Sequence, residues 1–292
     1  MLQRHRGVPF NGARADFGGQ TSSETPMLDL EFAALSHAGN VREHNEDCIG
    51  HAAPAKPEEA RTHGWFFVLA DGVGGQDRGE VASHTAVDTL ISAFRSARES
   101  ESPTGLLPRI IQTANLKIYE TAAAASPGGS SMCTTLVACL VRYDRATVAH
   151  VGDSRCYLIR RGVATILTQD HTLVGEQVRM GLLSHEEAAQ SEKRHVLSRS
   201  LGANMVVNAE INQHQVLPGD LLLLSSDGLH ASVTPKEIAS ITSKFHDLPQ
   251  AAHQLVSLAL DKDGGDNISV QLLRVKNVER IGMYRGRPYK LR

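Results

Sequence analysis

Residues 136–167 read LVACLVRYDRATVAHVGDSRCYLIRRGVATIL, a series of apolar runs separated by short polar turns. One turn falls at residues 143–145, Tyr-Asp-Arg, and another at Arg161-Gly162. Turns this short join neighbouring antiparallel strands, because a parallel crossover needs about a dozen or more residues. The stretch therefore predicts antiparallel hairpins and an α+β fold rather than a Rossmann-like α/β fold.

Apolar runs and amphipathic segments alternate in the rest of the chain. Residues 66–70, 221–224 and 268–275 are candidate buried strands, in addition to 136–141 and 148–151. Two consecutive helices are predicted where apolar side chains recur at helical spacing. These side chains are Val87, Leu90, Ile91 and Phe94 in the first helix and Leu107, Ile110, Ile111 and Ala114 in the second.

The chain divides into three parts. Residues 1–28 are polar with little apolar periodicity, which predicts a poorly ordered leader. Residues 29–276 are long enough for a single domain with one substantial core. Residues 277–292 form a basic C-terminal tail, for which we expect a solvated end, with a docking role left open.

Composition excludes several classes of function. With 30 Lys and Arg against 32 Asp and Glu, the net charge is -2, which argues against nucleic-acid or anionic-membrane partners. The chain has no run of 18 apolar residues and no secretory signal, so we expect a cytoplasmic protein. Its 4 cysteines form no CxxC pair, which predicts reduced, mostly buried thiols.

Aspartates flank several of the predicted strands. Asp71 and Asp227 each follow an apolar run and precede a glycine, and Asp153 follows Gly152. A single Asp-Gly pair is most simply a turn. Asp47 and Asp266 also flank predicted strands, and carboxylates that converge cannot all stay ionised without cations between them.

An oxygen-only ligand set suits hard cations such as Mg²⁺ or Mn²⁺. Two such ions about 3.5 to 4 Å apart would activate a water for phosphoryl hydrolysis. Gly72 could add its backbone carbonyl, and Arg42 could hold a phosphate dianion through paired hydrogen bonds. The alternatives are a phosphate-cradling loop at residues 73–75 and a plain surface arginine at position 42.

Five short motifs containing these residues follow one another along the chain. They are Arg42-Glu43-His44-Asn45-Glu46-Asp47, Asp71-Gly72-Val73-Gly74-Gly75, Gly152-Asp153-Ser154-Arg155, Ser226-Asp227-Gly228 and Gly265-Asp266-Asn267. Taken in order, they resemble the motif series of metal-dependent type 2C (PPM) serine/threonine protein phosphatases of the bacterial type. The resemblance spans about residues 30–275, and residues 169–171 (Gln-Asp-His) and 195–202 match bacterial members as well.

The resemblance implies a sandwich of two antiparallel β-sheets flanked by pairs of helices, with a metal centre at one end. Asp71 would bridge two cations, Asp227 and Asp266 would complete the first site, and the Gly72 carbonyl would serve the second. Asp47 would also bind a metal directly.

Further roles follow from the same resemblance. Glu46 would bond metal-bound water, and Asn267 would support the ligands from behind. Asp153 would bind a third, weaker metal together with Asp227. The alternative is that Asp153 is an acceptor that fixes the hairpin and Arg155.

The implied reaction is attack by a metal-bridging hydroxide on phosphoserine or phosphothreonine, with Arg42 and Asp71 as catalytic residues. Animal members have a histidine, proposed as the general acid, where this chain has Val73, so protonation of the leaving group is unassigned. The polar segment 171–197 matches a flap beside the cleft, and Ser184 with Glu187 predicts a capping box there.

The expected partners are phosphoserine and phosphothreonine proteins, with a cognate Ser/Thr kinase and its targets. The protein itself is expected to be a monomer. An alternative is a catalytically silent phosphoprotein-binding module of the same fold. A third possibility is a regulator that dephosphorylates an anti-sigma-factor antagonist, which would normally carry sensor or coiled-coil segments that this sequence does not show.

Overall fold

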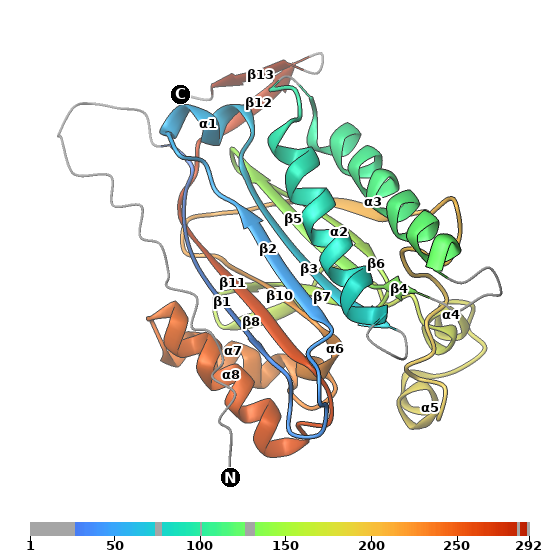
Figure 1. The fold of residues 1–292 in the computed structure, drawn as a ribbon. Helices are drawn as coiled ribbons and strands as arrows, with labels where there is room; N and C mark the ends of the chain where they lie inside the picture. Colours follow the sequence, from blue (N-terminus) through green and yellow to red (C-terminus); the bar gives the residue numbers. More distant parts are fainter. Residues whose placement is uncertain (1–26, 74–77, 100, 126–131, 285–286, 291–292) are drawn as a thin grey trace, which may run out of the picture.

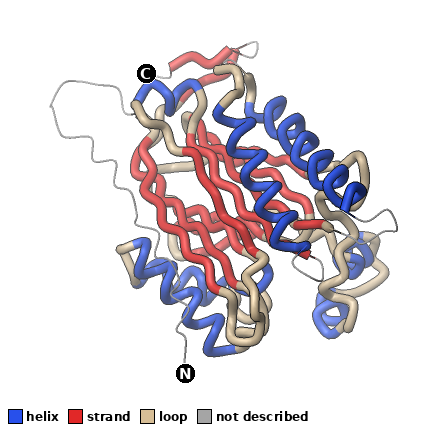
Figure 2. Tube along the Cα trace, viewed as in Figure 1, coloured by secondary structure: helices blue, strands red, loops and turns tan. Residues whose placement is uncertain are grey.

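The computed structural model describes residues 27–73, 78–99, 101–125, 132–284 and 287–290. Two antiparallel β-sheets lie face to face, and a pair of helices covers the outer face of each (Figure 1). Figure 2 shows the strands together in the middle of the molecule with helices on both sides. The predicted α+β sandwich is confirmed.

One sheet has six strands in the order β2-β3-β5-β6-β9, with β4 paired to β3. The predicted turn at residues 143–145 joins β5 to β6, and Tyr143 adopts a positive φ of 61° there. The strands are β2 (Asp47–Ala52), β3 (Trp65–Val73), β4 (Cys133–Thr134), β5 (Leu136–Arg142), β6 (Arg145–Val151) and β9 (Glu210–Gln215).

The other sheet has five strands in the order β1-β11-β10-β7-β8. The predicted hairpin at Arg161-Gly162 joins β7 to β8. The strands are β1 (Asp29–His37), β7 (Arg155–Arg160), β8 (Val163–Ile166), β10 (Leu221–Ser225) and β11 (Ile268–Asn277).

Helices α2 (Arg78–Arg95) and α3 (Pro103–Ala125) are the two predicted from apolar spacing, and they pack on the six-stranded sheet. On the other side lie α7 (Pro235–Lys244) and α8 (Leu248–Lys262). Thr234 and Asp247 cap the starts of α7 and α8 by accepting backbone N–H bonds. Two short helices, α1 (Pro57–Thr62) and α6 (Asp227–His230), lie elsewhere in the chain.

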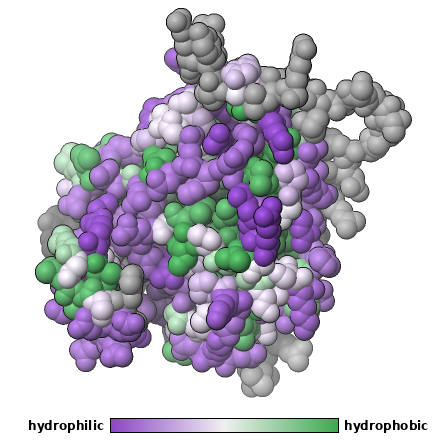
Figure 3. All heavy atoms as spheres, turned by 180° about the vertical axis from the view of Figure 1, so that it is seen from behind, coloured by the Kyte–Doolittle hydropathy of each residue, from purple (hydrophilic) through white to green (hydrophobic). Residues whose placement is uncertain are grey.

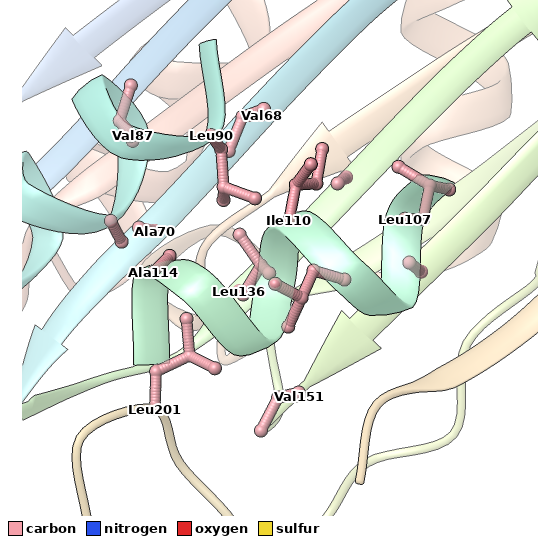
Figure 4. Packing of buried hydrophobic residues seen from close by; sticks show 14 of the residues in the cluster. Val68, Ala70, Val87, Leu90, Leu107, Ile110, Ala114, Leu136, Val151 and Leu201 are labelled. Carbon is pink, nitrogen blue, oxygen red and sulfur yellow. The ribbon is translucent and has the colours of Figure 1, made fainter. Parts of the chain in front are cut away.

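The apolar core forms three layers, one beneath each helix pair and one between the sheets. Figure 4 shows the first, where Leu107, Ile110 and Ala114 of α3 face strand residues that include Leu136 and Val151. Ile91, predicted as a core residue of α2, is only partly buried and packs at the margin.

The segment between β8 and β9 contains two helices, α4 (Leu173–Arg179) and α5 (His185–Gln190), where the sequence predicted one. The capping box of Ser184 and Glu187 is present at the start of α5. We call residues 171–197 the flap. None of the described helices is both long and apolar enough to cross a membrane.

Packing extends slightly beyond the predicted limits of the domain. Leu28 and Val278 are buried, and Glu279 accepts a 2.7 Å bond from Arg61. The tail was expected to be a solvated end, but it contains a hairpin of β12 (Ile281–Tyr284) and β13 (Arg287–Lys290). The predicted leader, up to residue 26, lies outside the described residues.

Asn115 joins α3 to the chain that returns from the flap. Its side chain is fully buried, accepts from the Gly202 N–H at 2.8 Å, and donates to the carbonyls of Asn204 at 2.9 Å and Met205 at 3.1 Å.

Buried groups that lose a partner each cost about 1 to 3 kcal/mol. Asn115→Ala should therefore lower the free energy of unfolding by about 3 kcal/mol, measured by urea denaturation. Asn212→Ala, at an exposed position of β9, should change it by under about 0.5 kcal/mol.

Candidate metal centre

Carboxylates from five separate segments meet at one end of the sandwich. Asp47 on β2 and Asp71 on β3 stand opposite each other in the strand register. Asp227 begins α6 directly after β10, Asp266 precedes β11, and Asp153 lies in the turn between β6 and β7. The structure thus brings together all five aspartates singled out in the sequence.

Strand β3 does not end at Ala70, as predicted, but continues through Asp71 and Gly72 to Val73. Pairing extends there because Asp71 faces Asp47 of β2, while Gly72 pairs with Thr134 of β4. Asp71 is therefore held inside a sheet rather than in a turn. Gly74 and Gly75 of the predicted loop lie outside the described residues.

The site is a region of strong electrostatic repulsion. Burial, with a further contribution from the charges of Asp227 and Asp266, raises the pKa of Asp47 to about 7. Burial, followed by the charges of Asp47 and Asp227, raises the pKa of Asp71 well above its usual range. Burial also raises the pKa of Asp153 to about 7, with Asp227 again adding to the shift.

One carboxylate oxygen in this group is left without a protein partner. Asp47 Oδ2 accepts a 2.8 Å bond from Ser226 Oγ, but the buried Oδ1 has no hydrogen-bond partner among the described residues. A buried, unpaired carboxylate oxygen beside other carboxylates is what a cation would neutralise. Oxygen donors alone fit Mg²⁺ or Mn²⁺, so the residues present suit the expected cations.

Gly72 is required by close packing. A Cβ at this position would collide with the carbonyl of Gly79 at the start of α2, and would come within 2.8 Å of the Glu46 carbonyl. The Gly72 N–H donates to that same Glu46 carbonyl at 3.1 Å. The Glu46 carboxyl in turn lies against Gly79. The predicted metal ligand Gly72 and the predicted water ligand Glu46 therefore lie side by side.

Asn267 fixes the segment that precedes Asp47. Its Oδ1 accepts the Glu46 N–H at 2.8 Å, and its Nδ2 donates to the carbonyls of Ala38 and His44, each at 2.9 Å. All three side-chain bonds are made to backbone groups, so Asn267 links the two loops through hydrogen bonds. This agrees with a supporting role behind the carboxylates.

Arg42 lies on the rim of the site. Its Nη2 donates to Asp266 Oδ2 at 2.8 Å, and the two side chains are 53% and 41% exposed. Asp266 holds the pKa of the guanidinium above its ordinary value. Arg42 was expected to face a phosphate, and in the structure its partner is instead a carboxylate of the site itself, within reach of the cleft.

The charge of Arg155 acts on Asp153, but the side-chain hydrogen bonds of Arg155 go to another residue than the alternative role of Asp153 would require. Arg155 makes a bidentate pair with Asp170, with bonds of 2.9 and 2.6 Å. The Asp153 backbone carbonyl instead faces His230 Nε2 at 3.0 Å. Burial, followed by Arg155, lowers the pKa of His230 to about 3, so this ring is neutral.

His171 fastens the flap to the metal end, which the sequence did not reveal. Its N–H donates to the Gly152 carbonyl at 2.9 Å, and the Gly152 N–H donates back to His171 Nδ1 at 3.2 Å. The His171 carbonyl accepts the Ser198 N–H at 2.8 Å, which closes the two ends of the flap. Gly152 has φ 99° and directly precedes Asp153.

The rings of His150 and His171 stack at 4.6 Å, next to Glu210. These three side chains are close enough together to hold a metal ion. However, the Gly152 N–H donates to His171 Nδ1, and the guanidinium of Arg199 stands 3.4 Å from His171 Nε2. Because both ring nitrogens face protein donors and one of these donors is a cation, the group is better explained as packing at the base of the flap.

A cleft of about 970 Å³ extends from the carboxylates to the underside of the flap. Arg42, Asp227 and Asp266 line one part of it, and flap residues line another. His195, from the flap, places its Nδ1 3.8 Å from Asp227 Oδ2 and is half exposed. Val73 is 40% exposed and offers no proton, in line with the gap noted from the sequence.

The chain is similar to known proteins along most of its length. The profile of the family described as Protein phosphatase 2C matches residues 55–261. A serine/threonine phosphatase stp from Listeria innocua is 34% identical over 255 residues, covering 85% of this chain and 95% of the Listeria protein.

Two solved structures show the same likeness in three dimensions. A Streptococcus agalactiae serine/threonine phosphatase has a TM-score of 0.77 at 33% identity, covering 85% of this chain and all (100%) of its own. The catalytic domain of a serine/threonine protein phosphatase PstP, solved in complex with 2 manganese ions, has a TM-score of 0.72 at 32% identity. It covers 85% of this chain and 99% of its own.

Removing one of the crowded charges should stabilise the metal-free protein. Asp47 and Asp153 have folded-state pKa values of about 7, against about 4 when unfolded. Because the folded state holds these protons more tightly, the stability that protonation gives is fully present below pH 4 and is lost as pH rises through 7. In EDTA, Asp71→Asn should melt at a higher temperature than the wild type at pH 8. The difference should shrink at pH 6, as measured by calorimetry. A variant that melts lower at pH 8 would contradict the repulsion.

His171→Ala should leave the buried Gly152 N–H without its acceptor and loosen the flap. We expect a loss of about 1 to 3 kcal/mol in the free energy of unfolding. His171→Asn, whose Oδ1 can stand near the former Nδ1, should recover part of that loss, whereas His171→Leu should not. Amide hydrogen exchange over residues 171–198 reads out the flap directly. Equal exchange in the Asn and Leu variants would show that the Gly152 bond is unimportant.

Proposed function

Because this chain belongs to the protein phosphatase 2C family and is a protein serine/threonine phosphatase, we propose that it removes phosphate from phosphoserine and phosphothreonine with two divalent cations, Mn²⁺ or Mg²⁺. The observation that carries the proposal is the cluster of buried aspartates with raised pKa values, in which Asp47 Oδ1 has no partner among the described residues. The two manganese ions of the PstP catalytic domain support it.

We assign the ligands as the family resemblance implies. Asp71 would contact both cations, which is supported by its electrostatic interaction with both Asp47 and Asp227. Asp227 and Asp266 would complete the first site. The Gly72 carbonyl would serve the second, and Asp47 would bind a metal directly.

The remaining residues would support this centre. Glu46 would bond to metal-bound water, and Asn267 would hold the Glu46 backbone in place. Asp153, together with Asp227, would form a third and weaker site. The raised pKa of Asp153 and its position in the same cleft as Asp227 support that assignment.

When bound, the cations supply a nucleophilic water of lowered pKa and neutralise charge on the phosphoryl oxygens. The chain contributes the rest. Arg42 is exposed at the cleft, and by exchanging Asp266 for the phosphate it would bind a dianion and orient it. The carboxylates need no movement, because strands and hydrogen bonds already hold them in place. Such preorganisation is the main source of electrostatic catalysis.

The substrates would be phosphoproteins, and we propose that a Ser/Thr kinase of the same cell produces them. A catalytically silent binding module of the same fold is the alternative. A module that only recognised phosphate would have no need for the buried repulsion among Asp47, Asp71 and Asp227, which destabilises the folded chain. The complete acidic set therefore favours catalysis.

The test is release of inorganic phosphate from a phosphothreonine peptide. Activity should require Mn²⁺ or Mg²⁺ and disappear in EDTA. Asp71→Asn and Asp227→Asn should each lower kcat/KM by on the order of 10²-fold or more, because each removes a ligand charge. Asp261→Asn, an exposed change on α8, is the matched control and should behave as wild type. Activity that persists in EDTA would refute the proposal, and Mn²⁺ binding in calorimetry without turnover would favour the silent module.

A further inference from the structure

The catalytic cleft is larger than the proposed reaction alone requires. Its volume of about 970 Å³ lies near the upper end of the range for sites that enclose a whole drug-sized ligand. A single phosphorylated side chain would fill only part of it. Because the same cleft is lined by Arg42 and Asp266 at the metal centre and by residues of the flap, a peptide bound through its phosphate would also contact the flap.

The part of the cleft under the flap has an apolar wall, which we define as Ile166, Val174, Val178 and Ala188. Ile166 ends β8 and is 39% exposed, whereas the other three belong to α4 and α5 of the flap. The wall is thus built from two separate elements. An exposed isoleucine within a concave surface is a feature of binding sites rather than of ordinary surface.

The charged groups between the metal centre and this wall largely satisfy each other. Arg155 and Asp170 both line the cleft, and their bidentate bonds of 2.9 and 2.6 Å pair the two charges. His230, another lining residue, faces the Asp153 backbone carbonyl through its Nε2 at 3.0 Å. The cleft therefore presents charge at the Arg42 end, whereas the flap contributes the apolar wall together with Arg194.

We propose that the apolar wall binds a large apolar side chain of the phosphoprotein substrate, close in sequence to the phosphorylated residue. The inference rests on the proposed function and names the class of its substrate: phosphothreonine or phosphoserine segments that carry a leucine-like residue beside the phosphate. The phosphate would lie at the metal centre while the neighbouring side chain is buried against Ile166 and Val178. Arg194 also lines the cleft, so recognition of an acidic side chain is the competing outcome.

The molecule offers matched controls for both elements of the wall. Val163 lies on β8, the same strand as Ile166, and is 62% exposed without lining the cleft. Met180, 65% exposed at the end of α4, is the counterpart of Val178. Leu182 and Val196 of the flap are also exposed and do not line the cleft, and Figure 3 shows apolar side chains in the lobe at lower left. Substitutions at exposed apolar residues outside the cleft therefore distinguish a general effect of surface charge from a specific effect of the apolar wall.

The experiment measures kcat/KM with Mn²⁺ on alanine-rich phosphothreonine peptides carrying a single Leu or Asp at each flanking position. Wild type should prefer Leu over Ala about 10-fold or more at one or two positions, as expected for a filled apolar pocket. Ile166→Asp and Val178→Asp should each bring that ratio close to 1. Val163→Asp and Met180→Asp should keep it. p-Nitrophenyl phosphate turnover, measured for every variant, reports on the metal centre and on folding.

Three results would overturn the proposal: no Leu preference at any position, a preference that survives both wall substitutions, or a preference for Asp that Arg194→Ala removes. If one wall variant fails to fold, the other variant and the wild-type peptide series still decide the matter. A wild-type protein that turns over neither peptides nor p-nitrophenyl phosphate would refute the proposed function instead, which keeps the two failures distinguishable.

Discussion

Repulsion among buried carboxylates at one end of the sandwich is the constraint on which the rest of the structure depends. Asp47, Asp71 and Asp227 would move apart if their backbones could, because burial and mutual charge both oppose their ionised forms. They are held together by rigid neighbours. Asp47 and Asp71 are paired residues of adjacent strands, and Asp227 is fixed between β10 and α6.

Hydrogen bonds from uncharged residues reinforce this arrangement without adding charge. Thr135 accepts the Asp71 N–H at 3.0 Å, and its own N–H donates to the Asp71 carbonyl at 2.8 Å. Ser226 bonds Asp47, and Asn267 spans the two loops beside it. The three apolar layers supply the favourable free energy that offsets the unfavourable charge. Stability is thus concentrated in the layers, and function at their end.

The sequence predicted what depends on local pattern. Turns such as Tyr143-Asp144 and Arg161-Gly162, the helical spacing around Leu107 and the capping box at Ser184 are properties of a few consecutive residues, and all are present. The order of the acidic motifs also predicted that the aspartates converge, because each motif lies at the edge of a recognisable strand. Their roles as ligands stay a prediction.

What escaped prediction depends on partners far away in the chain. The end of β3 was misplaced because Gly72 pairs with Thr134, which lies 62 residues later in the sequence. The pairing of Arg155 with Asp170 and the tie between His171 and Gly152 join segments whose approach only the closed hairpins create. The hairpin in the basic tail and helix α4 of the flap lack the strong periodicity that makes an element visible in a sequence.

The flap combines a fixed base with a variable surface, and this division follows from how it is attached. At its base, the Gly152 carbonyl accepts the His171 N–H, and the His171 carbonyl accepts the Ser198 N–H. Asp170, the residue before His171, pairs with Arg155. These contacts join the flap to the turn that carries Asp153, so displacement at the base would disturb the metal end. Beyond the base, α4 and α5 have few contacts with the helices and strands of the body, so a change in their cleft-facing residues should not move a carboxylate. A fold with this arrangement can keep one reaction while changing which segments it accepts.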